Sequence, residues 1–279
     1  MDDRLVWLLE RFELRARVFQ AGAFRCGGTN PARPGIGYLH IVERGRVRLT
    51  SQDAGRLEID EPTAFFYMNP EEHRIDPLDP DTSLVCATFE FGLGEGNPLQ
   101  RALPGLVVVR LADAPELAAT LQQLFAEADG DHCGRQAVID RLSEVALILI
   151  LRGLMDQDRL DVGLLAGLAD PRLRRAINAI HADPARQWTL ASLAQSAGMS
   201  RARFAARFRD VVGMTPGDYL SEWRLGLAQS MLLRGKPVKF IAAEIGYGSA
   251  SALSRVFSAR CGISPRQWVN RRSAGIENL

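Results

Sequence analysis

The chain has 279 residues, of which 47% are hydrophobic and 24% charged, and its 34 Lys and Arg nearly balance its 33 Asp and Glu. This composition is typical of a globular protein that buries a core, and the length allows two domains. The most apolar run, Val145 to Met155, is shorter than the roughly 18 residues of a membrane-spanning helix. The acidic N-terminus also lacks the features of a signal peptide. We therefore expect a cytoplasmic protein without a membrane partner.

Short runs rich in Val, Ile, Phe, Tyr and Leu occupy about residues 15–112. Clusters of Gly, Pro, Asn and Asp separate these runs, as turns separate strands. The predicted strands lie in residues 17–26, 37–50, 56–60, 63–69 and 83–92. Several short strands at this spacing predict an all-β sandwich or barrel.

The pattern changes to helical spacing near residue 113. Within the predicted helix of residues 135–157, an apolar stripe includes Val138, Leu142, Val145 and Leu149. Such a helix is too apolar to lie free in water. We expect part of it to cover the β domain and the rest to pair with a second subunit; the alternative is packing within one chain only. A glycine-bearing joint, residues 163–170, leads into a segment that is helical to the end.

The small net charge conceals an asymmetry between the two halves of the chain. Residues 170–279 carry 17 basic and 7 acidic side chains, whereas residues 1–169 carry 17 basic and 26 acidic ones. A basic domain of this size favours a polyanionic partner, and an acidic companion domain indicates a separate task.

Two segments of the basic half, residues 193–220 and 241–269, repeat one another. The matched pairs are Leu193 with Ile241, Ala194 with Ala242, Gly198 with Gly246, Phe208 with Phe257, Gly213 with Gly262, Pro216 with Pro265, and Tyr219 with Trp268. Each segment reads as a short helix, a glycine-containing turn, and a second helix. Ser200 and Ser249 are the predicted N-caps of the second helices. This order of elements is that of a helix-turn-helix.

The second helix of each unit leaves one face free to bind DNA in the major groove. The predicted DNA-binding residues are Ser200, Arg201, Ala202, Arg203, Arg207, Ser249, Ser251, Ser254 and Arg255. A predicted helix over residues 218–233 joins the units, and a rigid helix of this size suits two sites about one DNA turn apart, roughly 34 Å. The alternative is a helical bundle whose arginines are merely solvated.

These C-terminal 110 residues resemble the DNA-binding domain of the AraC/XylS family of bacterial transcription factors. The resemblance rests on "AGMS", "GMTP", "WRLGLAQSMLL", "IAAEIGYGSASALSRVF" and "GISPRQW". It implies double-stranded DNA and RNA polymerase as partners. In one departure, Ala206 stands where the second unit has Arg255, and the arginine of the first unit follows at Arg207. The first unit should therefore depend more on Arg201, Arg203 and phosphate contacts.

The β region resembles the cupin-type sensor of a subgroup of these regulators, through "YLHIVERGRVRL", "FFYMNPEEHRI" and "LVCATFEFG". The predicted fold is therefore α+β: a cupin-like barrel in residues 1–112, a helical dimerisation segment in 113–169, and an all-α domain with two helix-turn-helix units in 170–279. The HxHxxxxE ligand cluster of catalytic cupins is absent from the sequence. A cupin metalloenzyme with a nucleic-acid-binding domain is the less favoured alternative, and an unregulated architectural DNA-binding protein is a third.

Four residues of the β region allow several roles: Cys26, His40, His73 and Cys86. They are structural if the thiol of Cys86 is a small buried apolar group and the histidines are hydrogen-bonded. Cys26 and Cys86 would form a redox switch if an oxidant closed a disulfide between them, as some members of the resembling subgroup respond to oxidants. His40, His73 and Cys86 suit a zinc ion. An organic effector in the barrel is the fourth possibility.

Overall fold

A computed structural model describes residues 5–11, 14–33, 35–52, 54–68, 71–91, 105–156 and 162–276. The chain divides into two compact units. The β unit comprises Glu13–Leu165, and the helical unit comprises Ala166–Leu279 together with the N-terminal segment Met1–Phe12. Within the described residues, no helix combines the length and the apolar character needed to cross a membrane.

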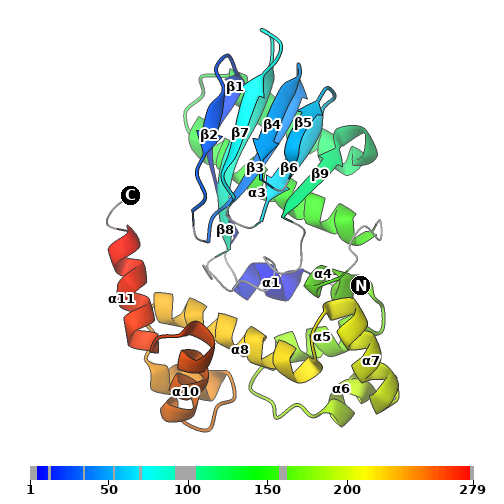
Figure 1. The fold of residues 1–279 in the computed structure, drawn as a ribbon, viewed down its shortest axis with the longest axis vertical. Coiled ribbons are helices and arrows are strands. Elements are labelled where there is room, and N and C mark those ends of the chain that lie inside the picture. Colours follow the sequence, from blue (N-terminus) through cyan, green and yellow to red (C-terminus); the bar gives the residue numbers. More distant parts are fainter. Residues whose placement is uncertain are drawn as a thin grey trace. The chain divides into compact units, whose positions relative to one another are not determined.

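The β unit is a sandwich of two antiparallel sheets (Figure 1). Its strands are β1 Leu14–Ala23, β2 Gly28–Asn30, β3 Gly37–Arg44, β4 Val47–Ser51, β5 Gly55–Ile59, β6 Thr63–Tyr67, β7 His73–Pro77, β8 Ser83–Phe91 and β9 Leu106–Arg110. One sheet has the order β1-β8-β3-β6-β9, and the other has the order β2-β7-β4-β5. The predicted all-β domain is confirmed, while the strands β2, β7 and β9 lie outside the predicted strand ranges.

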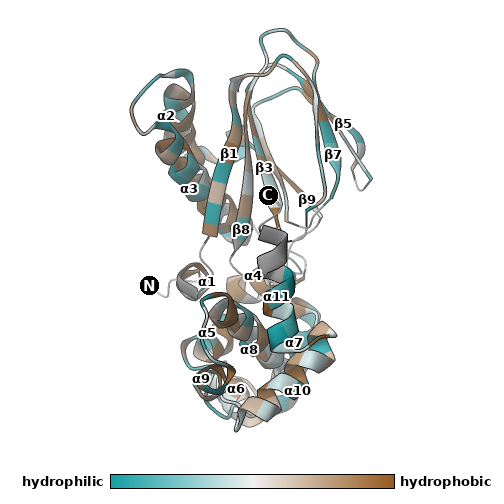
Figure 2. Cartoon of the chain, turned by 90° about the vertical axis from the view of Figure 1, so that its left-hand side faces the viewer, coloured by the Kyte–Doolittle hydropathy of each residue, from teal (hydrophilic) through white to brown (hydrophobic). Residues whose placement is uncertain are grey.

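Alternation of apolar and polar residues places the core between the two sheets. Figure 2 shows this alternation along β1, whose buried positions include Ala16 and Val18. The central strands β3 and β6 are almost wholly buried, and each is paired with a neighbouring strand on both edges. The core joins both sheets through residues such as Phe65 of β6 and Leu49 of β4.

Helices α2 (Ala118–Asp129) and α3 (Arg135–Asp156) pack on β1 at the edge of the larger sheet (Figure 2). An edge strand exposes backbone groups that pair readily with other chains. Here the backbone N–H of Val18 donates to Asp140 of α3 at 2.7 Å, and the N–H of Ala16 donates to Glu144 at 3.1 Å. Helix α3 therefore closes this edge with its carboxylates.

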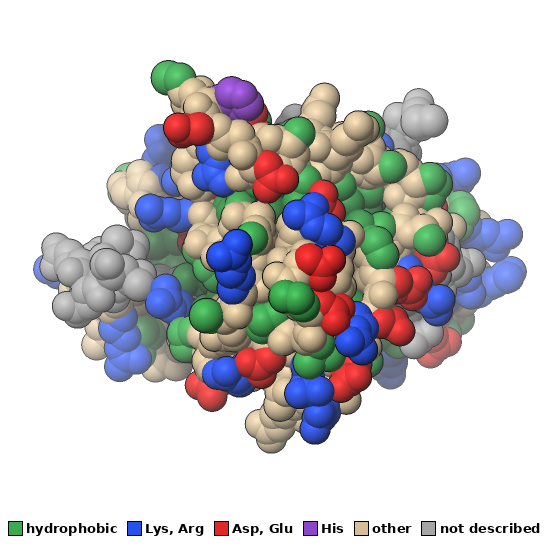
Figure 3. Space-filling view, turned by 90° about the horizontal axis from the view of Figure 1, so that it is seen from above, with side chains coloured by type: hydrophobic (Ala, Val, Ile, Leu, Met, Phe, Trp, Pro, Cys, Tyr) green, Lys and Arg blue, Asp and Glu red, His purple; other side chains and the backbone are tan. Residues whose placement is uncertain are grey.

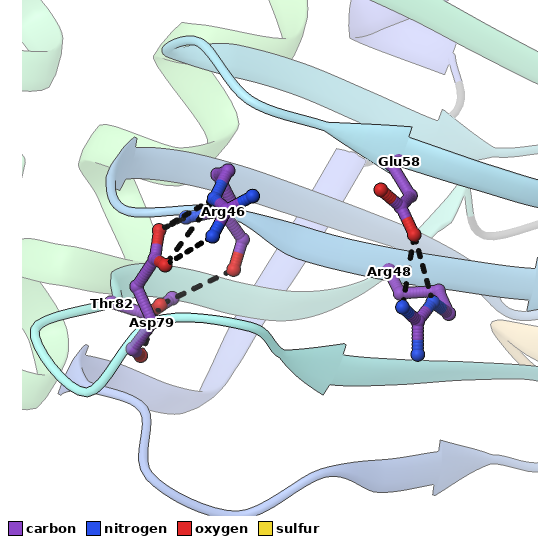
Figure 4. A network of polar contacts seen from close by, with 5 residues as sticks. All are labelled: Arg46, Arg48, Glu58, Asp79 and Thr82. Atoms are coloured by element: carbon purple, nitrogen blue, oxygen red, sulfur yellow. Dashed lines mark hydrogen bonds and ion pairs between the residues drawn. The ribbon is translucent and has the colours of Figure 1, made fainter.

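The outer face of the smaller sheet carries exposed ion pairs between strands. Arg48 of β4 donates to Glu58, its direct partner on β5, at 2.9 Å (Figure 4). Arg46 donates to Asp79 through its guanidinium at 2.8 Å and through its backbone N–H at 2.9 Å. Basic and acidic side chains are likewise interspersed on the face drawn in Figure 3. Exposed pairs of this kind add little stability, so we assign this face to solvent.

Among the described residues, eight helices, α4 to α11, lie in the segment Ala166–Leu279. Helix α4 begins slightly earlier, in the β unit. They are α4 Leu164–Ala169, α5 Leu173–Ala182, α6 Leu190–Ser196, α7 Arg201–Val212, α8 Pro216–Leu233, α9 Val238–Glu244, α10 Ala250–Cys261 and α11 Pro265–Ile276; α1, Val6–Arg11, also belongs to this unit. Helix α8 confirms the predicted connecting helix and begins two residues earlier, with Thr215 as its N-cap. Figure 1 shows α7 near one end of α8 and α10 near the other.

Gly246 occupies the turn between α9 and α10 with a φ of +84°. A β-carbon at this position would meet the Cα of Ala185 at 2.8 Å, and its carbonyl oxygen more closely still. Both the left-handed backbone and the approach of a second backbone therefore require glycine here. This explains the glycine that punctuates the second repeat.

We predict that Gly246→Ala lowers the free energy of unfolding of the helical unit by about 2–4 kcal/mol, because backbone strain and a backbone clash add. Urea unfolding followed by tryptophan fluorescence measures this unit, since all four tryptophans, at positions 7, 188, 223 and 268, belong to it. Gly235→Ala is the matched control, because Gly235 has a φ of +72° and open space around a β-carbon. Equal losses in the two variants would contradict the role of the Ala185 contact.

Candidate functional site

The first helix-turn-helix consists of α6 and α7. Ser200 caps α7, because its hydroxyl oxygen accepts the backbone N–H of Arg203. Leu193 of α6 and Phe204 and Phe208 of α7 are fully buried and hold the two helices together. The predicted cap is confirmed.

The second helix-turn-helix consists of α9 and α10 and repeats this plan. The hydroxyl oxygen of Ser249 accepts the backbone N–H of Ala252 at 3.1 Å and caps α10. Ile241 of α9 and Leu253 and Phe257 of α10 are buried, and the two helices contact each other. Each unit thus presents its second helix on a rigid apolar base, and we call α7 and α10 the reading helices.

The exposed side of α7 carries three of the predicted DNA-binding residues, Arg201, Ala202 and Arg203. Arg207 is also exposed, but its guanidinium donates from Nε and Nη2 to one carboxylate oxygen of Asp170, both at 2.6 Å. Asp170 lies just before α5 and was not among the predicted site residues. The sequence signal that could have indicated Asp170 is its position as an acidic residue directly before the basic helix α5.

The exposed side of α10 carries Ser251 and Arg255, with Ser254 half-buried beside them. Arg255 is exposed and forms no ion pair within the part of the chain that the structure describes, so its guanidinium is available to bind DNA. Arginine and serine side chains in this arrangement match the donors and acceptors of base edges and phosphates.

Helix α8 is buried along most of its length and connects the two helix-turn-helix units. Trp223 is fully buried and stacks on His181 of α5, with the ring centroids 3.6 Å apart. The guanidinium of Arg224 donates to the carbonyl oxygens of Pro184 and Arg186 at 2.8 and 2.9 Å. These contacts bind the connecting helix to the segment between α5 and α6, and they were not predicted from the sequence.

The β unit contains a buried pair of histidines, His40 on β3 and His73 on β7. Their Nε2 atoms lie 2.8 Å apart, so one hydrogen bond joins the two sheets. Burial lowers the pKa of both rings, and for His40 the nearby His73 lowers it further. Both rings are therefore neutral near pH 7.

The hydrogen bonds of this pair determine its tautomers. Nδ1 of His73 lies 3.0 Å from the carbonyl oxygen of Glu71, which can only accept, so Nδ1 carries the proton. Nε2 of His73 is then the acceptor and Nε2 of His40 the donor. The lone pair on Nδ1 of His40 is buried and has no hydrogen-bond partner among the described residues. Aromatic rings surround the pair, namely Tyr38, Phe65 and Tyr67.

The predicted zinc ligands do not form a complete set. His40 and His73 meet, and Cys86 is the Cα partner of His40 across β3 and β8. Over the described residues, however, no group of three or more His, Cys, Asp or Glu side chains is placed to hold a metal ion. His40, His73 and Cys86, the predicted zinc ligands, therefore form a pair of hydrogen-bonded histidines with a neighbouring thiol, and not a three-ligand metal site.

The predicted redox residues differ in their surroundings. Cys26 is exposed and Cys86 is buried in the sandwich core, and neither is disulfide-bonded. Burial raises the pKa of the Cys86 thiol, which suppresses the reactive thiolate. Cys133 is exposed and Cys261 half-buried.

Known proteins match both units. A cupin family model covers residues 3–156, and a helix-turn-helix domain model covers residues 193–271. An uncharacterized HTH-type transcriptional regulator of Haemophilus influenzae is 34% identical over 87% of this chain and 88% of its own length. The HTH-type transcriptional regulator AlkR of Acinetobacter baylyi is 30% identical over 83% and 79%. The crystal structure of ToxT from Vibrio cholerae covers 93% of this chain and 97% of its own, with 13% identity and a TM-score of 0.41.

A cupin-like sandwich followed by a twin helix-turn-helix domain is the domain order of a two-domain transcription regulator. The chain belongs to the AraC family of helix-turn-helix transcriptional regulators that carry an N-terminal cupin domain.

We predict that a maleimide labels Cys26 and Cys133 of the folded protein rapidly at neutral pH, whereas Cys86 is labelled only after unfolding. The exposed thiols are accessible, while burial keeps Cys86 protonated and shielded. Peptide mapping by mass spectrometry assigns the labelled residues, and labelling in urea serves as the control. Labelling of folded Cys86 as fast as Cys26 would contradict the prediction.

Proposed function

We propose that this regulator reads a specific duplex DNA sequence with α7 and α10, and that a signal received by its cupin domain controls this binding. The observation that carries the proposal is the pair of reading helices on one buried connecting helix, α8, each with an exposed polar face. The excess of basic residues in this half of the chain supports a polyanionic partner.

The dimensions of α8 support simultaneous binding by both units. Its 18 residues span about 27 Å at 1.5 Å per residue. With the reading helices near its two ends (Figure 1), this length is comparable to the spacing of major-groove sites about one turn, or roughly 34 Å, apart. Arg201, Ala202 and Arg203 contact the first site, while Ser251, Ser254 and Arg255 contact the second. Ser200 and Ser249 place the N-termini of the reading helices against the phosphates.

The sensing step is assigned to the interior of the β sandwich. The unpartnered Nδ1 of His40, within a ring of aromatic side chains, supports a small molecule that donates a hydrogen bond. Two other signals are possible within this proposal. One is an oxidant that acts on Cys26 and Cys86, and the other is a metal ion at His40, His73 and Cys86. The exposure of Cys26 supports the first of these, and the incomplete ligand group is unfavourable to the second.

A second copy of the chain is the proposed partner of α3. The stripe of Val138, Leu142, Val145 and Leu149 lies opposite the side of the helix that binds β1. Val138 is 41% and Val145 43% exposed, which is unusual for valines on a well-packed helix. Pairing of two such stripes buries them and suits DNA targets made of repeated half-sites. RNA polymerase is the proposed partner at the promoter, and the cytoplasm is the proposed location.

Selection of genomic fragments bound by the full-length protein, with and without an oxidant, tests the proposal. A shared sequence motif of two elements spaced about one helical turn apart is the expected result. Binding that is steeply salt-dependent but indifferent to sequence would instead indicate an architectural DNA-binding protein.

We predict that Arg255→Ala weakens binding to the selected site by about 1–3 kcal/mol and relaxes one base preference, because a base-edge contact is lost. Competition titrations against single-base variants of the site measure both effects. Arg175→Ala, an exposed arginine of α5, is the control for lost charge. Equal losses on specific and random DNA would show that Arg255 contacts only phosphate.

We predict that Val145→Asp converts a dimer into a monomer, because a carboxylate would be buried in the apolar interface. Multi-angle light scattering at micromolar concentration measures the mass. Gln122→Glu on the exposed side of α2 adds the same charge elsewhere and should leave the dimer intact. A monomeric wild-type protein, or a dimeric Val145→Asp variant, would contradict the role of this stripe.

A further inference from the structure

Asp170 connects the start of the helical unit to the first reading helix. It follows α4, which leads out of the β unit. Its Oδ1 accepts the backbone N–H groups of Arg172 and Leu173 at 2.8 and 3.0 Å, and its Oδ2 accepts the two donors of Arg207. The Asp170 side chain is only 7% exposed, while that of Arg207 is 52% exposed. The arginine thus covers the carboxylate.

The ionised form of Asp170 is the stable one. Burial opposes ionisation, but the N–H groups of Leu173 and Arg172 and the guanidinium of Arg207 together hold the pKa of the carboxyl below its usual value. Charge-assisted hydrogen bonds of this length are stronger than neutral ones. Moving Arg207 onto DNA would remove both of its bonds from a nearly buried carboxylate. The pair therefore resists opening.

The position of Arg207 on α7 supports the same conclusion. An open hollow separates α7 from the turn that contains Asp170 and Arg172, and Arg203, Ala206 and Asp210 also line it. Arg207 crosses this hollow to the turn, whereas Arg203, one helical turn earlier, forms no ion pair in the described part of the chain. Arg207 and Asp170 together carry no net charge, so the pair releases no counterion from DNA.

We propose that Asp170 is a specificity-determining residue that withholds Arg207 from the DNA backbone. The inference rests on the proposed DNA-binding function and revises the role of one residue in it. With Arg207 neutralised, α7 carries one fewer phosphate contact, and its sequence-independent affinity is lower. A larger fraction of the binding free energy then comes from contacts that distinguish one base sequence from another.

The test measures affinity of the full-length protein for a random duplex and for the selected site over a range of salt concentrations. Asp170→Asn should steepen the slope of log K against log salt on random DNA by about 0.9, the value for one additional phosphate contact. Its affinity for random DNA at about 0.1 M salt should rise about five- to tenfold. The ratio of specific to random affinity should fall accordingly.

Three further variants separate positioning from charge. Asp210→Asn removes the same charge from the same hollow and should leave the ratio unchanged, because Asp210 forms no hydrogen bond or ion pair with Arg207 in the described part of the chain. Arg207→Gln alone should leave the salt slope at its wild-type value. The double variant Asp170→Asn with Arg207→Gln should restore that slope, because the released guanidinium is then absent. Thermal unfolding identifies any variant that fails to fold, and Arg207→Gln is decisive if Asp170→Asn fails.

Two results would overturn the proposal. One is a salt slope that falls by about one in Arg207→Gln, since Arg207 would then already contact phosphate. The other is identical behaviour of Asp170→Asn and Asp210→Asn. Failure of the proposed function is a different result, because the wild-type protein would then show no preference for any duplex sequence.

Discussion

The burial of α8 is the constraint on which the geometry of the helical unit depends. Arg224 of α8 is buried, so its guanidinium needs hydrogen-bond acceptors inside the protein. Two backbone carbonyls from the segment after α5 provide them. Tyr219, one turn earlier, hydrogen-bonds to His181 at 2.6 Å, and Trp223 stacks on the same ring. These contacts restrict α8 to one position relative to α5 and α6. The position of α8 therefore sets the distance between α7 and α10.

The reading helices share a plan but differ in the charge that they offer. Arg255 of α10 is uncommitted in the described structure, whereas Arg207 of α7 is bound to Asp170. Ala206 stands at the position that repeats Arg255, so α7 also lacks an arginine there. We therefore propose that α10 is the helix that contributes more to base recognition. The first is attached through Asp170 to the segment that follows the cupin domain.

The interior of the cupin domain contains a buried polar atom, Nδ1 of His40, that has no hydrogen-bond partner among the described residues. A buried nitrogen without a partner costs free energy, and such atoms are rare in folded proteins. In this sandwich the atom belongs to a histidine pair that joins the two sheets. On the outside, α3 closes the β1 edge with one side and presents its apolar stripe with the other. The same helix thus serves the fold and the proposed dimer.

The sequence by itself determined the order of a β domain and a helical domain, most of the strands and helices, and both helix-turn-helix units. Periodicity and caps such as Ser200 and Ser249 are local features, and local features are encoded in neighbouring residues. The repeat also predicted which faces of α7 and α10 contact DNA. Tertiary structure alone decided which charges are available, because Asp170 meets Arg207 across 37 residues and His40 meets His73 across 33. It also decided that Cys86 is buried while Cys26 is exposed. Such pairings depend on how distant segments pack, and no spacing along the chain encodes them.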